Sequence, residues 1–195
     1  MPAPMPVAYP HYLVIDFEAT CCDLGSVPRG EMEIIEFGAV MTDDRFNPID
    51  EFVCFVKPVR HPRLTAFCTG LTTIRQQDVD AAPGFAEALA AFDAWLRPWR
   101  DAAFCSWGDY DRHQLQQDCD FHRLPNPAPA PHLNVKALFS ELLGLKRTYG
   151  LAGAVERAGL AFAGTHHRGI DDARNIARLL PFVFGEARLP QTTHA

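Results

Sequence analysis

The 195-residue sequence has no long hydrophobic run, no leader-like start and no excess of basic residues. Since a helix needs about 20 apolar residues to cross a bilayer, we expect no membrane partner. Met1 to Pro10 places no basic residue before an apolar block, so we expect no signal peptide. The net charge of −6 argues against a broad surface that binds along nucleic acid, but not against an enzyme that binds only the end of a chain.

The cysteines lack the placement of a disulfide framework or of a zinc site. Two of them are adjacent, three lie in or beside apolar segments, and none forms a Cys-x-x-Cys pair. Free thiols indicate a reducing compartment, so we expect a cytoplasmic protein. The residues concerned are Cys21, Cys22, Cys54, Cys68, Cys105 and Cys119.

The chain is long enough to bury a sizeable core, and 48% of its residues are hydrophobic. We expect one domain over residues 11–185, with short tails at 1–10 and 186–195. The Pro-rich start and the end from Leu189 to Ala195 are predicted to be disordered.

The order of the apolar segments predicts an α/β fold with a mixed five-stranded sheet flanked by helices. Strands are predicted at His11–Phe17, Glu33–Met41 and Glu51–Lys57, and their short connections favour an antiparallel meander. Helices then alternate with strands. The later elements are a short helical turn at 72–79, helices at 84–99, 110–123, 136–143, 149–158 and 170–184, and strands at 102–107 and 132–135.

Two carboxylates follow the first apolar strand, in the segment Asp16-Phe17-Glu18. Side chains alternate along a strand, so Asp16 and Glu18 share one face while Phe17 points to the other. Like charges on one packed face repel each other, which favours a compensating cation, and hard oxygen ligands suit Mg²⁺ or Mn²⁺. Taken alone, the pair is equally typical of a strand that simply ends in polar residues.

A second acid lies where the fourth strand leads into a helix, at the carboxyl end of the sheet where sites form. Asp109 and Asp111 compete for the role. Asp111 shares its helix face with Leu115 and Cys119 and is predicted to point inward, whereas Asp109 is the expected N-cap. We therefore expect Asp111 to be the ligand.

The start of the last helix offers another pair, Asp171 and Asp172. Asp172 lies on the apolar stripe of Ile176, Leu179 and Leu180, whereas Asp171 lies with Arg174, Asn175 and Arg178 on a face predicted to be exposed. We therefore favour Asp172 as a ligand. His167 lies five residues before it, and a neutral imidazole can accept a proton from water.

These segments together resemble the DEDDh, or DnaQ-like, 3′–5′ exonucleases, whose fold is RNase H-like. The opening Asp-Phe-Glu-Ala-Thr-Cys and the segment Phe67 to Ile74 are most similar to the Eri-type exoribonuclease branch. The motifs that carry the resemblance follow in order at Asp16–Cys21, Glu33–Gly38, Trp107–Asp111 and His167–Ala177.

The resemblance implies a site for two Mg²⁺ or Mn²⁺ ions, roughly 3.5–4 Å apart, that hydrolyses a phosphodiester. His167 would be the general base. The implied metal ligands are Asp16, Glu18, Asp111 and Asp172.

The resemblance also implies contacts with the terminal nucleotide, by Phe17, Ala19, Thr20 and His167. Phe67 and Leu71 would contact the terminal base, although packing under a loop is an equal alternative for both. Two further side chains receive structural roles: Glu36 as a hydrogen-bonding residue around the site and Trp107 as part of the core.

We expect an exonuclease that acts at single-stranded 3′ ends, prefers RNA to DNA and releases nucleoside 5′-monophosphates. The net negative charge favours local contacts with such an end over an extended duplex. The alternatives are an exonuclease for DNA or short oligonucleotides and a non-catalytic regulatory module on the same fold. Nothing in the sequence identifies protein partners.

Overall fold

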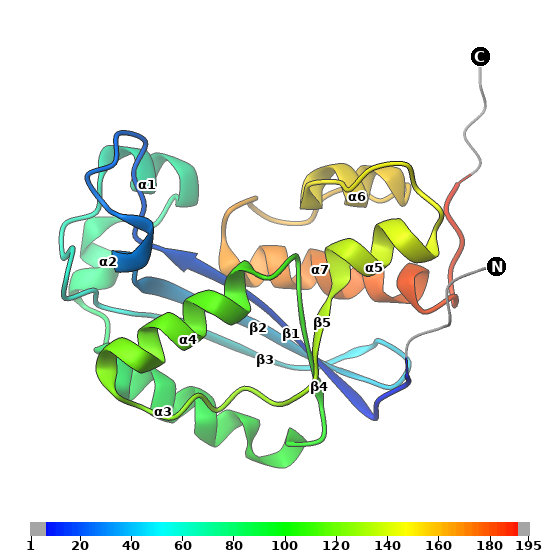
Figure 1. Cartoon of the computed structure of the whole chain (residues 1–195), viewed down its shortest axis with the longest axis horizontal. Coiled ribbons are helices and arrows are strands. Elements are labelled where there is room, and N and C mark those ends of the chain that lie inside the picture. The colour runs from blue at the N-terminus through cyan, green and yellow to red at the C-terminus, as the bar shows by residue number, and fades with distance from the viewer. Residues whose placement is uncertain (1–6, 191–195) are drawn as a thin grey trace.

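The computed structural model describes residues 7–190, with a five-stranded sheet at its centre (Figure 1). The strand order is β3-β2-β1-β4-β5. The first three strands form the predicted antiparallel meander, and β4 and β5 run parallel to β1. The strands are β1 (His11–Ala19), β2 (Ile34–Asp43), β3 (Pro48–Phe55), β4 (Ala103–Ser106) and β5 (His132–Asn134).

Helices cover both faces of the sheet, which confirms the predicted α/β class: α3 and α4 lie on one side, and α5, α6 and α7 on the other (Figure 1). None of the helices within residues 7–190 combines the length and hydrophobicity needed to cross a membrane. The helices are α1 (Ala66–Thr72), α2 (Gln76–Asp80), α3 (Phe85–Leu96), α4 (Tyr110–His122), α5 (Val135–Leu142), α6 (Leu151–Arg157) and α7 (Gly169–Val183), with 3₁₀ turns η1 (Arg29–Glu31) and η2 (Arg97–Trp99).

The short helical turn predicted at 72–79 is present as α2, with shifted bounds, whereas α1, which ends at Thr72, is an additional helix before it. The Thr65 side chain caps α1 by accepting a hydrogen bond from the Cys68 amide at 3.0 Å. Thr73 then adopts a left-handed conformation with φ 62°, which ends α1 before α2 begins.

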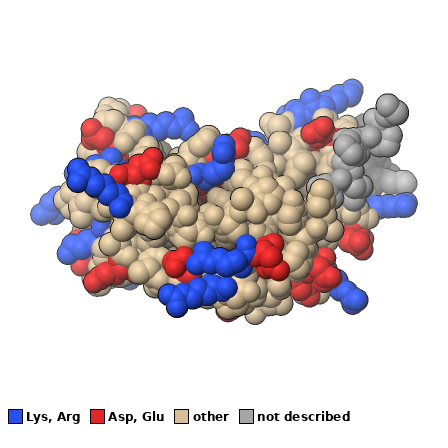
Figure 2. Space-filling model, turned by 60° about the horizontal axis from the view of Figure 1, so that its bottom comes forward, with Lys and Arg blue, Asp and Glu red and all other residues tan. Residues whose placement is uncertain are grey.

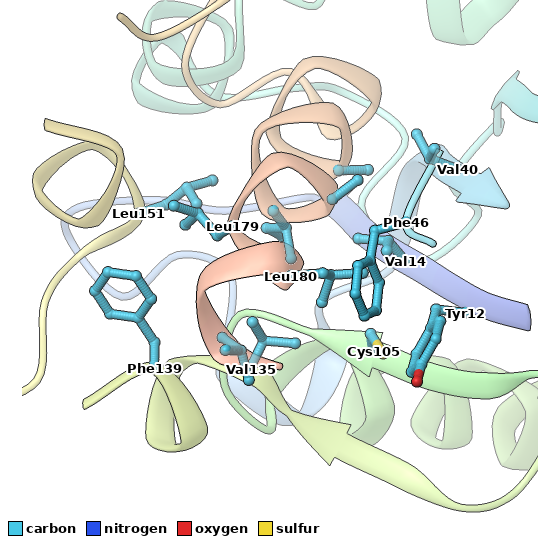
Figure 3. Close-up of a cluster of buried hydrophobic side chains, with 14 of the residues drawn as sticks. Tyr12, Val14, Val40, Phe46, Cys105, Val135, Phe139, Leu151, Leu179 and Leu180 are labelled. Carbon is cyan, nitrogen blue, oxygen red and sulfur yellow. The ribbon is translucent and has the colours of Figure 1, made fainter. Parts of the chain in front are cut away.

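Alternation along β1 divides the core into two layers. Tyr12 and Val14 pack with α5, α6 and α7, whereas Leu13, Ile15 and Phe17 pack with α3 and α4. Figure 3 shows the first layer, in which Leu179 and Leu180 of α7 lie among side chains of the strands and of α5.

All six cysteines are free, as expected. The tail segments 1–6 and 191–195, predicted to be disordered, lie outside the described residues.

The start of α7 approaches the sheet closely through two glycines. Gly38 of β2 faces the first turn of α7, where a Cβ would overlap the backbone of Gly169 and Ile170. A Cβ on Gly169 would lie 2.7 Å from the Asp16 carbonyl oxygen. Because both positions lack a side chain, the helix start can rest directly on β1 and β2.

Candidate active site

Asp16 and Glu18 extend the face of β1 that packs against α7, as the alternation predicts. Phe17 points the other way and packs against Phe37, with ring centroids 4.9 Å apart. Glu18 is buried, and Asp16 keeps partial exposure. The first two carboxylates therefore meet on the helix side of a strand that is paired on both edges.

Asp111 reaches this face from the first turn of α4. Its Oδ1 accepts a hydrogen bond from the backbone amide of Phe17 at 2.9 Å, which ties the helix start to β1 between the two carboxylates. Asp111 is buried with Leu115 and Cys119, as predicted. Asp109 occupies the N-cap position but makes no capping hydrogen bond; its Oδ2 accepts instead from the side-chain Nδ2 of Asn134 at 2.8 Å.

Asp172 is buried at the start of α7, on the same face as Ile176 and Leu179, as predicted. Asp171 forms an ion pair with Arg174, which lies on the same helix face, at 3.0 Å. The prediction that Asn175 is exposed is wrong. Asn175 is fully buried because its side chain binds the backbone of Ala163, which connects α7 to the loop before it.

The predicted metal ligands and His167 line one cavity of about 350 Å³. Carboxylate oxygens of Asp16, Glu18 and Asp172 lie within 4.8 Å of one another. The full lining is Asp16, Phe17, Glu18, Trp107, Tyr110, Asp111, Gly150, Leu151, His166, His167 and Asp172.

His167 lies in the loop before α7 and has a left-handed backbone with φ 64°. Its ring stacks on that of His166, with centroids 4.0 Å apart, and its amide donates to Asp172 Oδ2 at 3.2 Å. Burial lowers the pKa of His167, and the neighbouring His166 lowers it further. The imidazole is therefore neutral at pH 7, as a proton acceptor must be.

The carboxyl groups of the cavity bind protons more tightly than ordinary ones. Burial, followed by repulsion from Asp172, raises the pKa of Glu18 to about 9. Burial raises the pKa of Asp111 to about 7 and that of Asp172 to about 7. Burial and the charge of Asp111 also raise the pKa of Asp16 well above its usual range. Perturbed groups that share a cavity indicate a functional site.

The donor set fits divalent cations. Asp172 Oδ1 is buried and has no hydrogen-bond partner, which is costly for a carboxylate oxygen unless a cation binds it. The available ligands are hard carboxylate oxygens, which suit Mg²⁺ or Mn²⁺. Asp16, Glu18, Asp111 and Asp172 would hold the metal.

Adding a divalent ion is expected to raise Tm more at pH 8 than at pH 5. The raised pKa values mean that the metal-free folded protein keeps protons that the unfolded chain has lost. Its free energy of unfolding therefore falls as the pH rises from about 4 towards 9. A cation relieves this repulsion. Thermal melts with EDTA and with Mn²⁺ at both pH values measure the effect, and equal Mn²⁺ shifts at both would contradict it.

Glu36 supports the site without lining it, as expected. The side chain is fully buried and binds the Arg168 guanidinium in two places, at 2.9 and 3.1 Å. It also accepts from the Gly169 amide at 3.0 Å. The ion pair holds the start of α7 on β2, and so helps to position Asp172.

The predicted nucleotide contacts occupy different environments and remain predictions. Ala19 and Thr20 are buried, and Thr20 Oγ1 accepts from the Glu33 amide at 2.9 Å. Phe67 and Leu71 lie on α1 with 41% and 36% of their surfaces exposed. The exposure of these two side chains leaves both available to a ligand.

Several cavity residues were not predicted from the sequence. Trp107 is predicted to lie in the core. It does pack against Phe139, but it also lines the cavity. His166 and Tyr110 stand directly before predicted site residues, and this adjacency was the only available signal. Gly150 and Leu151 come from the start of α6, which no motif connects to the site.

Comparison with known proteins agrees with this geometry. The family model described as Exonuclease matches residues 13–180. The 3′–5′ exonuclease Snipper of Drosophila melanogaster is 33% identical over 193 residues, covering 88% of this chain and 68% of the relative. Human ERI1 exoribonuclease 3 is 34% identical over 200 residues, covering 95% of this chain and 58% of the relative.

A solved structure shows the same fold. The nuclease domain of 3′hExo, a DEDDh family member bound to rAMP, superposes with a TM-score of 0.84 at 29% identity, covering 94% of this chain and 97% of that one. Product-bound exonuclease I, at 14% identity and a TM-score of 0.68, shares the fold alone. The RNase H-like fold is thus confirmed, and the chain belongs to the exonuclease family, in the group of metal-dependent DEDDh 3′–5′ exonucleases.

Proposed function

We propose that this chain hydrolyses single-stranded RNA from the 3′ end and releases nucleoside 5′-monophosphates, with two Mg²⁺ or Mn²⁺ ions. The observation that carries the proposal is the convergence of Asp16, Glu18, Asp111, Asp172 and His167 on one cavity. A non-catalytic module would not need these raised carboxyl pKa values beside a neutral histidine.

The residues of the site would have separate roles in the reaction. The divalent ions, when bound, would stabilise charge on the attacking and leaving oxygens. Asp172 accepts from the His167 amide and thereby fixes the loop that carries the base. A ring nitrogen of His167 would take the proton from the attacking water. His166 stacks on that ring and limits its rotation.

Local binding suits this protein better than long contacts with a duplex. The net charge is −6, and on the described part of the face shown in Figure 2 basic and acidic side chains are interspersed around an uncharged centre. The preference for RNA is supported by the relatives named as exoribonucleases and by the rAMP bound to 3′hExo. DNA is the second candidate substrate, favoured only by the shared phosphodiester chemistry.

The test compares matched 5′-labelled RNA and DNA oligomers with Mn²⁺, Mg²⁺ and EDTA. The expected result is a ladder that shortens from the 3′ end, faster for RNA than for DNA and absent with EDTA. Faster hydrolysis of DNA would overturn the RNA preference. RNA binding without hydrolysis under any metal would favour a regulatory module.

His167→Ala is expected to lower kcat by about 10²–10⁴-fold, the usual contribution of a general base. The acidic metal ligands stay in place, so the Mn²⁺-induced rise in Tm should persist. His122→Ala is the matched control, because His122 lies at the far end of α4 from Asp111. Unchanged kinetics in His167→Ala would remove this residue from the mechanism.

A further inference from the structure

A second pocket, of about 240 Å³, adjoins the catalytic cavity through a shared side chain. Tyr110 lines both cavities, and the next residue, Asp111, is one of the acidic ligands. The second pocket follows α4 away from the site. Gln117, at the far end of the lining, lies seven positions after Tyr110, a distance of about 10 Å along the helix. The lining is Arg29, Tyr110, His113, Gln114 and Gln117.

The pocket presents a guanidinium that no acid neutralises. Arg29 takes part in no ion pair within residues 7–190, and the nearby Glu31 is bound instead to His61 at 2.9 Å. Beside the pocket, Arg112 contacts His113 Nε2 at 3.0 Å but is paired with Asp109 at 3.7 Å, so Arg29 supplies the unpaired positive charge of the lining. A lining of this kind, in a protein with a net charge of −6, favours an anionic ligand.

The η1 turn that carries Arg29 is held in place by α4. Gln117 donates to the Met32 carbonyl at 2.8 Å and to the Arg29 carbonyl at 3.4 Å. Gln114 donates to the same Met32 carbonyl at 2.8 Å. The guanidinium therefore projects from a fixed backbone, which reduces the entropy lost when a ligand binds.

We propose that this pocket binds backbone phosphates of the nucleotides that precede the scissile bond. The inference rests on the proposed function, because it takes the catalytic cavity as the place of the 3′-terminal nucleotide. The strand then continues past Tyr110 along α4 to Arg29. Arginine matches phosphate with paired donors, and Tyr110 offers a ring near the point where the strand leaves the cavity.

The experiment measures binding of a 5′-fluorescein ten-nucleotide RNA by anisotropy across a range of salt concentrations. Ca²⁺ replaces Mg²⁺ and the last linkage is a phosphorothioate, so that the RNA stays intact. Arg29→Gln is expected to weaken binding about tenfold at low salt. It should also make the slope of log K against log salt less steep by about 0.7 for each lost phosphate contact.

Two controls make the result specific. Arg45→Gln changes an exposed arginine in the β2–β3 turn, at the end of the sheet opposite Asp16, and should leave the slope unchanged. A nucleoside 5′-monophosphate should bind Arg29→Gln and the unaltered protein equally, because it fills only the catalytic cavity. Unchanged RNA affinity and slope in Arg29→Gln would overturn the subsite, as would an equal loss for the monophosphate.

The outcomes for this subsite and for the proposed function are separable. If the unaltered protein degrades RNA but Arg29→Gln leaves the salt dependence of RNA binding unchanged, only the subsite is refuted. If Arg29→Gln makes the salt dependence of RNA binding less steep but the unaltered protein never hydrolyses RNA, only the exonuclease proposal is refuted.

Discussion

Asp172→Asn is expected to lower kcat on an RNA oligomer roughly a thousandfold, which corresponds to about 4 kcal/mol of transition-state stabilisation. The substitution removes the negative charge of a side chain whose Oδ1 has no hydrogen-bond partner, while the amide keeps nearly the same shape. Because Asp172 also repels its neighbours, the metal-free variant should melt at a higher temperature than the unaltered protein at pH 8. Hydrolysis rates with Mn²⁺ and thermal melts with EDTA measure the two effects.

Asp171→Asn is the matched control for this experiment. Asp171 precedes Asp172 directly but pairs with Arg174 and accepts from the Thr165 amide at 2.8 Å, outside the cavity. It should retain most of the activity. Full activity in Asp172→Asn together with a large loss in Asp171→Asn would show that the helix-face assignment is wrong.

Gly38→Ala is expected to destabilise the protein by about 3 kcal/mol and to lower activity about a hundredfold or more. The added Cβ would overlap the backbone of Gly169 and Ile170, which cannot move aside like the end of a flexible side chain. The start of α7 must then shift away from β2, and Asp172 shifts with it. A displacement of about 1 Å is enough for a loss of this size.

Denaturant unfolding and hydrolysis rates of soluble protein test this prediction, with Gly153→Ala as control. Gly153 lies inside α6, where a Cβ would meet Tyr149 at an ordinary 3.6 Å. Alanine there should raise stability by roughly 0.5–1 kcal/mol. Equal stability of Gly38→Ala and the unaltered protein would show that the close approach of α7 is not needed.

The convergence of the four acidic residues on one cavity could be predicted because each follows a local periodicity. Strand alternation placed Asp16 and Glu18 together, and helix faces separated Asp111 from Asp109. Such patterns depend only on neighbours in sequence, and each of the four acidic residues lies near the start or end of a regular element. The same reasoning gave the meander and most helix bounds to within a few residues.

Features that depend on distant partners could not be predicted in the same way. Asn175 follows a polar pattern, but its amide is buried because it binds the Ala163 backbone. The break between α1 and α2 has a local cause, the left-handed backbone of Thr73, but threonine rarely adopts this conformation and so gives no sequence signal for it. The contact between Gly38 and Gly169 joins residues far apart in the sequence, so it can be recognised only in the folded structure, where the start of α7 packs on β2.

The last helix completes the site, and this has a consequence for biosynthesis. Ribosomes release β1 long before α7, so a growing chain carries Asp16 and Glu18 without Asp172, His167 or the cover that α7 provides. Until that helix leaves the exit tunnel, the nascent polypeptide lacks part of the candidate site. The order of synthesis thus makes the α7 segment the last part of the candidate site to be added.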